Sequence, residues 1–274
     1  MLHAFNRYEI KYLVDAAEAA TLREEIERRL DRDRHSGDRG YGVWSVYYDT
    51  RQLRFYWEKI EGLKFRRKLR VRHYGDRFSV GEDTPVYVEI KQRVNRVTQK
   101  RRVRLPYRDA LLLCDGRTLV EHEPAERPFL EEVLDLVLRL DLRAVATTGY
   151  TRHAYLGRGA DVGLRVTFDQ RIRGRDRDFH LGADAGDRLI VPARKVIMEV
   201  KADERVPYWL TDLTAKRNLQ VVRVSKYCQS VEAYGLAPRS VFHVPDHDLD
   251  PDPDLDPDPD LDAGRSRPAV PLEA

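Results

Sequence analysis

The chain has 274 residues, of which 42% are apolar and 35% are charged, enough apolar residues to exclude a wholly disordered chain. No apolar run approaches the roughly 18 to 20 residues that cross a bilayer, and residues 1–7 lack the apolar core of a signal peptide. We therefore expect a cytoplasmic protein. Cys114 and Cys228 are the only cysteines, which excludes a disulfide framework and predicts two free, buried or half-buried thiols.

The net charge of +3 hides an asymmetry between the body and the end of the chain. Residues 244–274 contain nine Asp, one Glu and two Arg, a net charge of −8, which leaves +11 on residues 1–243. A basic body implies an anionic ligand, so that nucleic acid, phosphorylated metabolites and anionic membrane all remain open. The tail repeats Asp-Leu-Asp-Pro-Asp-Pro, and we expect one domain over 1–243 and a disordered, solvated Asp/Pro-rich tail over 244–274.

The predicted elements alternate short strands with a few helices. In chain order we expect a strand over 7–13, a helix over 16–31, strands over 64–74, 86–93 and 98–105, a helix over 128–140, strands over 149–155, 163–169 and 195–201, and a helix over 207–218. Asp15 followed by Glu18 is typical of a helix N-cap. Because strands dominate, the helices should flank a sheet.

The predicted strands share one property, a charged face opposite an apolar one. Between residues 64 and 74, Lys and Arg at 64, 66, 68, 70 and 72 alternate with apolar Phe65, Leu69 and Val71. The same alternation places on charged faces Glu9, Lys11, Glu89, Lys91, Arg93, Lys100, Arg102, Arg104, Arg152, Arg165, Asp169, Lys195, Glu199 and Lys201. Most of these charges are positive.

Three geometries explain such strands. An open sheet can expose its polar face to water above a helical layer, an open basic sheet can bind nucleic acid, or a closed barrel can enclose a charged interior. The third is stable only if the interior is wet and filled with counter-charge, which a polyphosphate chain would supply. Aromatic residues are few on the cationic faces, apart from Tyr74 and Tyr87, which disfavours nucleic acid.

Three Glu-x-Lys repeats, beginning at Glu9, Glu89 and Glu199, place a carboxylate and an ammonium on the same face. Each alone is typical of a cross-strand ion pair, but carboxylates among many cations also suit Mg²⁺ or Mn²⁺ bridging phosphate oxygens. The chain has no P-loop sequence and its histidines lack metal-ligand spacing. Phosphoryl transfer on a polyphosphorylated substrate is the chemistry that the residues suggest.

Six short motifs resemble a known family. They are Arg7-Tyr8-Glu9-Ile10-Lys11-Tyr12, Val46-Tyr47-Tyr48-Asp49-Thr50, Leu69-Arg70-Val71-Arg72-His73-Tyr74-Gly75, Val88-Glu89-Ile90-Lys91, Met198-Glu199-Val200-Lys201 and Val224-Ser225-Lys226-Tyr227. In this order, over roughly residues 4–236, they resemble the VTC domain, which is the polyphosphate polymerase domain. That domain belongs to the triphosphate tunnel metalloenzymes, which are relatives of the CYTH phosphatases.

The resemblance implies an α+β fold, with an antiparallel β-barrel tunnel of charged interior flanked by helices. It implies a polymerase that transfers the γ-phosphoryl group of ATP to inorganic polyphosphate with Mn²⁺ or Mg²⁺. Carried over, Arg70 and Arg72 are the main phosphate clamp, and Lys226 and Glu199 complete the catalytic set, with Glu199 as metal ligand. The implied substrate contacts are Lys11, Lys59, Lys91, Arg152, Arg165, Lys201 and Ser225.

The alternatives to a polymerase are a tunnel-fold triphosphatase and a non-catalytic polyphosphate-binding subunit. The expected ligands are ATP and inorganic polyphosphate, with no nucleic acid. If the polymer is exported, a separate membrane partner must carry it across.

Overall fold

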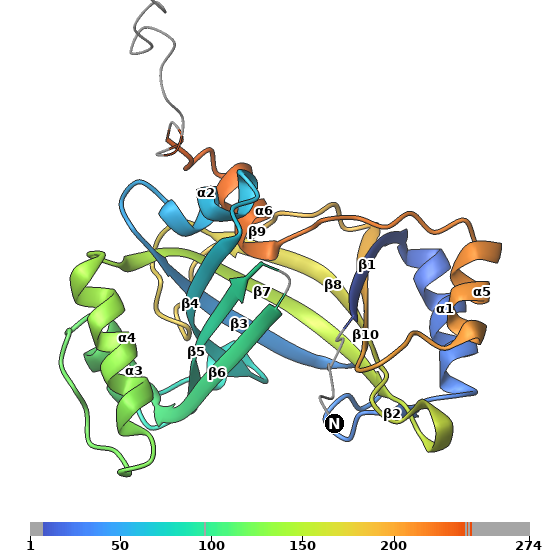
Figure 1. The fold of residues 1–274 in the computed structure, drawn as a ribbon, viewed down its shortest axis with the longest axis horizontal. Coiled ribbons are helices and arrows are strands. Elements are labelled where there is room, and N and C mark those ends of the chain that lie inside the picture. The colour runs from blue at the N-terminus through green and yellow to red at the C-terminus, as the bar shows by residue number, and fades with distance from the viewer. Residues whose placement is uncertain (1–7, 96, 239, 241, 243–274) are drawn as a thin grey trace, which may run out of the picture. The chain divides into compact units, whose positions relative to one another are not determined.

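The structure, a computed structural model, describes residues 8–95, 97–238, 240 and 242 (Figure 1). Its described residues up to Ser240 belong to one compact unit. The tail expected over 244–274 lies outside the described residues, as does Arg7 at the start of the first motif. No helix in the described ranges is long and apolar enough to cross a bilayer.

The unit is an antiparallel sheet with helices, as the α+β prediction requires. The strands are β1 (Tyr8–Asp15), β2 (Asp31–Arg32), β3 (Tyr41–Asp49), β4 (Phe65–Tyr74), β5 (Pro85–Val94), β6 (Val97–Pro106), β7 (Arg143–Leu156), β8 (Arg165–Arg175), β9 (Arg188–Leu189) and β10 (Lys195–Ala202). The α-helices are α1 (Ala16–Glu27), α2 (Arg54–Ile60), α3 (Tyr107–Cys114), α4 (Arg127–Arg139), α5 (Tyr208–Lys216) and α6 (Lys226–Ala233), with short 3₁₀ turns at Arg77–Ser79 and Gly159–Asp161.

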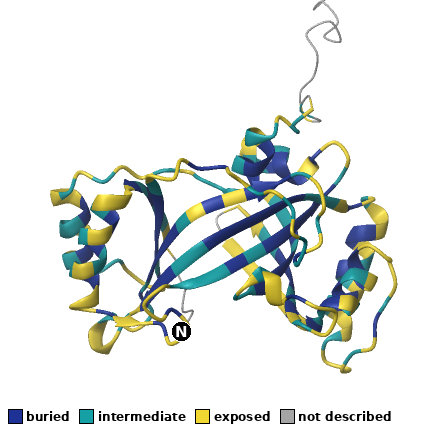
Figure 2. Cartoon of the chain, turned by 180° about the vertical axis from the view of Figure 1, so that it is seen from behind, coloured by how far each residue is buried: buried dark blue, intermediate teal, exposed yellow. Residues whose placement is uncertain are grey.

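Two apolar cores cover the outer side of the sheet at its two ends (Figure 1). At one end α3 and α4 pack on β4, β5 and β6, through residues such as Leu69, Val88 and Leu130. At the other end α1 and α5 pack on β1, β10 and β8, through residues such as Leu22 and Phe168. Buried residues accordingly follow the strands and the sheet-facing sides of these helices (Figure 2).

The sheet is strongly curled but is not closed by backbone hydrogen bonds. Its strands follow the order β1-β10-β8-β7-β3-β4-β5-β6, which leaves β1 and β6 as edges. In a flat sheet β1 and β5 would lie roughly 29 Å apart, six spacings of about 4.8 Å. Instead Lys91 Nζ on β5 lies 3.3 Å from Glu9 Oε2 on β1, so side chains rather than a backbone ladder bridge the gap in the expected barrel.

The segment before α6 runs along the free edge of β1. Val222 N donates to Lys11 O at 2.8 Å, and Lys11 Nζ donates to Val224 O at 3.1 Å. Ser225 caps α6 by accepting from Cys228 N, and its hydroxyl also accepts from Lys68 Nζ on β4 at 2.7 Å. This segment therefore connects β1 with β4 across the open side of the sheet.

Asp49, at the end of β3, fixes α2 and α6 to the sheet. Its buried carboxylate accepts from the backbone N–H groups of Thr50, Phe55 and Tyr56 at 2.7–3.0 Å. It also accepts from the hydroxyl of Tyr227 on α6. One side chain thus holds the first turn of α2 and the helix that carries Ser225 and Lys226.

The sequence-based elements differ from the structure in particular places. The expected helices over 16–31, 128–140 and 207–218 begin within a residue of α1, α4 and α5, but α1 ends at Glu27. Asp15 does not cap α1 with its side chain, which instead pairs with Lys195 at 3.0 Å. The short helices α2, α3 and α6 were not predicted, because seven to eight residues give too little helical period. Both cysteines are free and buried, as expected.

Replacing Asp49 should destabilise the fold more than replacing an exposed carboxylate. We expect Asp49→Ala to lower the free energy of unfolding by about 3 kcal/mol, because buried donors and the first turn of α2 lose their acceptor. Urea denaturation measures this. Asp135→Ala, which removes an exposed pair with Arg139 on α4, should cost less than about 1 kcal/mol. Equal costs would contradict the role assigned to Asp49.

Candidate functional site

The side of the sheet opposite the apolar cores carries most of the charged residues of the strands. We call it the interior face. Strand register places on it Lys11, Arg66, Lys68, Arg70, Arg72, Lys91, Arg93, Lys100, Arg102, Arg104, Arg152, Arg165 and Lys201, with the carboxylates of Glu9, Glu89, Asp169 and Glu199 among them. Cations far outnumber carboxylates, so this face attracts anions.

Glu89 organises the cations of β4 and β6. Its buried carboxylate lies 2.6 Å from Arg70 Nη2 and 2.5 Å from Lys100 Nζ, with Arg72 Nη1 at 3.9 Å. Burial raises the pKa of Glu89, but these cations outweigh burial and lower it to about 2. The carboxylate is therefore ionised at neutral pH, and it holds two predicted clamp residues, Arg70 and Arg72, side by side.

Asp169 joins three elements on the other side of the interior face. It accepts two hydrogen bonds from Arg152, Nε to Oδ1 at 2.6 Å and Nη2 to Oδ2 at 2.7 Å. It also accepts from Lys226 Nζ at 2.6 Å. Burial raises the pKa of Asp169, whereas Arg152 and Lys226 lower it further than burial raises it. Two predicted site residues from β7 and α6 thus meet at one carboxylate.

Glu9 and Glu199 flank Lys11 on neighbouring strands. Lys11 Nζ lies 3.2 Å from Glu9 Oε1 and 3.9 Å from Glu199 Oε2, and Lys201 Nζ lies 2.6 Å from Glu199 Oε1. Burial raises the pKa of Glu199, but Lys201 and Lys11 hold it well below its usual range. Burial, with Lys11 and Lys201, lowers the pKa of Lys91 to about 8.

Two predicted residues lie at the margin of this arrangement. Lys59 is half-buried on α2, and burial together with Arg66 and Lys68 lowers its pKa, which places it in the same positive field. Arg165, at the start of β8, lies 3.2 Å from Asp33 Oδ2 and is engaged outside the clusters around Glu89 and Asp169. The other predicted residues are brought together.

Tyrosine rings lie beneath several of the cations. The guanidinium carbons of Arg72, Arg102 and Arg152 lie 5.8, 4.5 and 5.2 Å from the ring centroids of Tyr74, Tyr87 and Tyr150, respectively. Lys226 Nζ also lies 4.5 Å from the Tyr150 ring. Cation–π contacts of this kind hold cations in position. Because cations already cover these rings, the rings are poorly placed to stack on nucleobases.

Sequence reasoning left four residues out of the site. Lys68 and Lys100 were on the predicted charged faces but were not singled out, although strand alternation alone places them beside Arg70 and Glu89. Asp169 was seen on its strand, but its link to Lys226 needs the tertiary fold. Thr167, opposite Glu199 in the register, had no sequence signal.

The carboxylates of the interior face fit a divalent metal only if substrate completes its coordination. In the described part of the chain, no three His, Cys, Asp or Glu side chains are placed to hold a metal ion. Glu199 and Glu9 nevertheless supply hard oxygen donors, and the neighbouring Thr167 hydroxyl is buried without a hydrogen-bond partner. Mg²⁺ commonly binds one or two carboxylates together with substrate phosphates and water, which matches this donor set.

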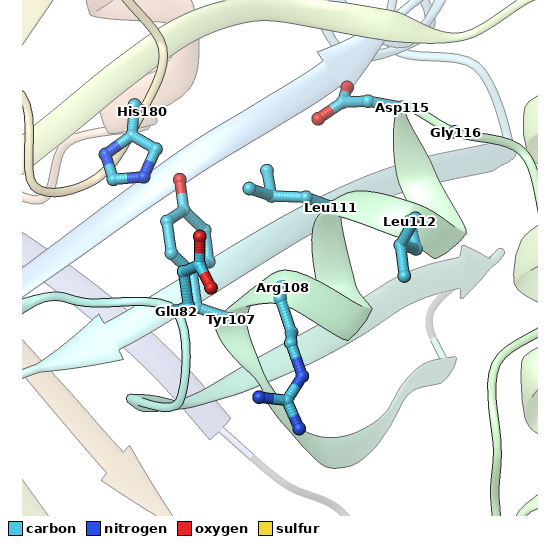
Figure 3. Close-up of a pocket in the computed structure, with 8 residues that line it drawn as sticks. All are labelled: Glu82, Tyr107, Arg108, Leu111, Leu112, Asp115, Gly116 and His180. Carbon is cyan, nitrogen blue, oxygen red and sulfur yellow. The ribbon is translucent and has the colours of Figure 1, made fainter.

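One cavity of the described residues lies away from the interior face. It has a volume of about 580 Å³ beside α3 and is lined by Tyr107, Leu111, Asp115 and His180, among others (Figure 3). Two of its polar side chains already have partners, since Tyr107 accepts from Leu181 N, and Asp115 accepts from Tyr48 at 3.0 Å. The charge pattern, rather than this cavity, identifies the candidate site.

Comparison with known proteins identifies the family of the chain. The family model of the VTC domain matches residues 6–234, most of the chain. The chain belongs to the VTC domain family. This VTC domain is 26% identical over 232 residues to vacuolar transporter chaperone complex subunit 4 of Trypanosoma cruzi, covering 73% of the chain and 29% of that protein.

The subunit of the same name from Trypanosoma brucei brucei is also 26% identical, over 77% of the chain and 31% of its own length. The chain thus spans about a third of the length of these relatives. Among solved structures, a candidate adenylate cyclase from Bacillus halodurans aligns over 79% of this chain and 92% of its own chain, with a TM-score of 0.46 and 11% identity. That similarity is too low to carry an argument.

The lowered pKa of Lys91 predicts a pH dependence of anion binding. Below pH 8 the ammonium is charged, and above it the charge is lost, so affinity for tripolyphosphate should fall as pH rises. Between pH 7 and 9.5 we expect the wild type to lose about tenfold in affinity relative to Lys91→Arg, which stays charged. Calorimetric titration of both proteins with the same ligand cancels the ligand's own titration. Lys216→Arg on α5 is the control, and parallel profiles for wild type and Lys91→Arg would contradict the assignment.

Proposed function

We propose that this VTC domain is a metal-dependent polyphosphate polymerase that transfers the γ-phosphoryl group of ATP to inorganic polyphosphate. The observation that carries the proposal is the cationic excess of the interior face, where Arg70 and Arg72 flank Glu89, and Lys226 is among the cations that lower the pKa of Glu199. Membership of the VTC domain family supports the proposal.

The chemistry needs no protein nucleophile. A terminal oxygen of the polyphosphate chain attacks the γ-phosphorus of ATP, the bond between that phosphorus and the β,γ-bridging oxygen breaks, and ADP leaves with the electron pair. Phosphoryl transfer of this kind depends on alignment and on neutralisation of negative charge. Arg70 and Arg72 offer planar forks for phosphate oxygens, while Lys11 and Lys226 act as point charges.

Their ion pairs keep these cations in place before substrate arrives. Arg152 and Lys226 share Asp169, so Lys226 can turn toward a phosphate while Arg152 still neutralises that carboxylate. Ser225, which accepts from Lys68, holds a second ammonium at the same end of the interior face. The site is therefore preorganised for an anion, which is how electrostatic catalysis gains its effect.

Glu199, with Glu9 and Thr167 beside it, would hold Mg²⁺ or Mn²⁺ together with substrate phosphates. When bound, the metal neutralises phosphate oxygens that the arginines do not reach.

A tunnel-fold triphosphatase is the second candidate function. Lys91 and Lys100 keep 40% and 39% of their side-chain surface exposed, so water can reach the interior face. Water in place of a polyphosphate oxygen would turn the same site into a hydrolase. A non-catalytic polyphosphate-binding subunit is the third outcome that the test below separates.

The relatives are named as subunits of a complex. From that similarity we also propose that this chain binds a partner protein. If the polymer crosses a membrane, the partner would be a membrane protein.

Turnover of ATP with Mn²⁺ or Mg²⁺, followed by phosphorus NMR, tests the proposal. We expect ADP and polymer in equal phosphoryl amounts, with little free phosphate. Arg72→Ala, Lys226→Ala and Glu199→Gln should each reduce kcat about a hundredfold, the usual cost of one preorganised charge. Lys216→Ala, far from the interior face on α5, is the matched control.

Each outcome assigns one function. Free phosphate without polymer would establish the triphosphatase, and no turnover with tight binding of tripolyphosphate would establish a binding subunit. Thermal unfolding of each variant, performed in parallel, separates lost activity from lost fold.

A further inference from the structure

A second groove lies on the opposite side of the sheet from the interior face. It has a volume of about 500 Å³ and is lined by Trp44, Asp76, Gly149, Thr151, Arg171 and Arg173, among others. In the view from behind, no helix lies over the middle strands of the sheet, between the two helical layers (Figure 2). We call this the outer groove.

Strand alternation shows that the outer groove is separate from the interior face. On β7, Tyr150 and Arg152 belong to the interior face, so Gly149 and Thr151 project to the other side. Gly149 stands opposite Arg173 on β8. The two arginines of the outer groove therefore line the side of the sheet opposite the interior face, although Tyr41 and Tyr150, which have the interior register, also contribute to the lining.

Two arginines of the outer groove are exposed and have no acidic partner. The side chains of Arg171 and Arg173 form no ion pair or hydrogen bond with the described residues, whereas most cations of the interior face are paired. Asp76 is the acidic side chain of the lining, and its carboxylate accepts from Phe78 N at 3.2 Å. The groove thus carries unneutralised positive charge.

The backbone at Arg171 is held in an unusual conformation. Its φ is +53°, in the left-handed region that costs a non-glycine residue about 1 kcal/mol or more. The register between β7 and β8 shifts there, between Gly149 and Thr151. Bulges of this type redirect a side chain, and here both Arg171 and Arg173 line the groove while Ile172 stays buried between them.

The groove also offers a neutral donor. Trp44 packs over Gly149, where an added Cβ would come within 2.1 Å of the indole ring, and Arg77 lies 5.0 Å from the ring centroid. The indole Nε1–H lies beside Gly42 and has no hydrogen-bond partner among the described residues. Gly149 and Arg77 cover the indole ring, so its edge rather than its face is available to a ligand.

We propose that the outer groove is a second anion site that binds a ligand carrying two or more phosphoryl groups. Two guanidinium forks and one indole N–H suit phosphate oxygens, and a single phosphate would engage only part of this set. The chemistry fits both a linear polyphosphate and a small molecule with several phosphate esters. The proposal does not depend on the function assigned to the interior face.

Calorimetric titration of the full chain with tripolyphosphate, and separately with inositol hexakisphosphate, tests the proposal and distinguishes the two sources. We expect binding at the outer groove by at least one of these probes, and weaker binding of orthophosphate. Arg171→Gln with Arg173→Gln should weaken that binding by at least about tenfold, since charge-assisted hydrogen bonds are lost. ATP turnover at the interior face should stay unchanged in this double variant.

The matched control is Arg51→Gln with Arg205→Gln, which removes the same charge from two exposed arginines outside the groove. Equal affinities and equal numbers of sites in wild type, double variant and control would overturn the proposal. So would equal losses in both double variants, because that result would reflect net charge alone.

Discussion

Repulsion between like charges on one face of a curled sheet is the constraint on which this structure depends. Arg70, Arg72 and Lys100 lie close together, and without a counter-charge they would disfavour the curl that joins β5 to β1. Glu89 supplies that counter-charge on one side, and Asp169 and Glu199 supply it on the other. These carboxylates neutralise only part of the cations, so a polyanion would stabilise the fold as it binds.

The same carboxylates give the site its order. Buried ion pairs contribute little to stability on their own account, but removing one partner is costly because the remaining charge stays buried. Each carboxylate here contacts cations from different strands or from α6, and thereby fixes the spacing of side chains that are far apart in the sequence. Asp49 does the same for the helices, since it joins α2 and α6 to the end of β3. The tyrosine rings under Arg72 and Arg152 complete this fixed arrangement.

Much of this arrangement could be predicted from alternation along single strands. Which face of β4 carries Arg70 and Arg72 follows from a period of two, and so does the pairing of Glu199 with Lys201. The contacts that close the sheet could not be predicted in this way. Lys91 with Glu9, and Lys226 with Asp169, join residues 82 and 57 positions apart, and no local pattern specifies such pairs. The prediction of a charged interior is therefore confirmed. The sheet is not closed into a barrel by backbone hydrogen bonds, because the ladder stops at β1 and β6. At Asp15 the local pattern was misleading. The sequence around it is typical of a helix N-cap, but in the structure its side chain pairs with Lys195.

The two sides of the middle strands have different chemistry. Most interior cations form ion pairs, and several of them lie over tyrosine rings, whereas Arg171 and Arg173 are exposed and their side chains form no ion pair with the described residues. A preorganised face suits a reaction, and a solvated pair of arginines suits reversible binding.

A crystal structure of the full chain with tripolyphosphate tests the central claim most directly, that the interior face is built to receive a phosphate chain. The account predicts phosphate oxygens within hydrogen-bond distance of Arg70, Arg72 and Lys11, with Asp169 still paired to Arg152. Phosphates bound only elsewhere on the protein, with every interior ion pair retained, would contradict it.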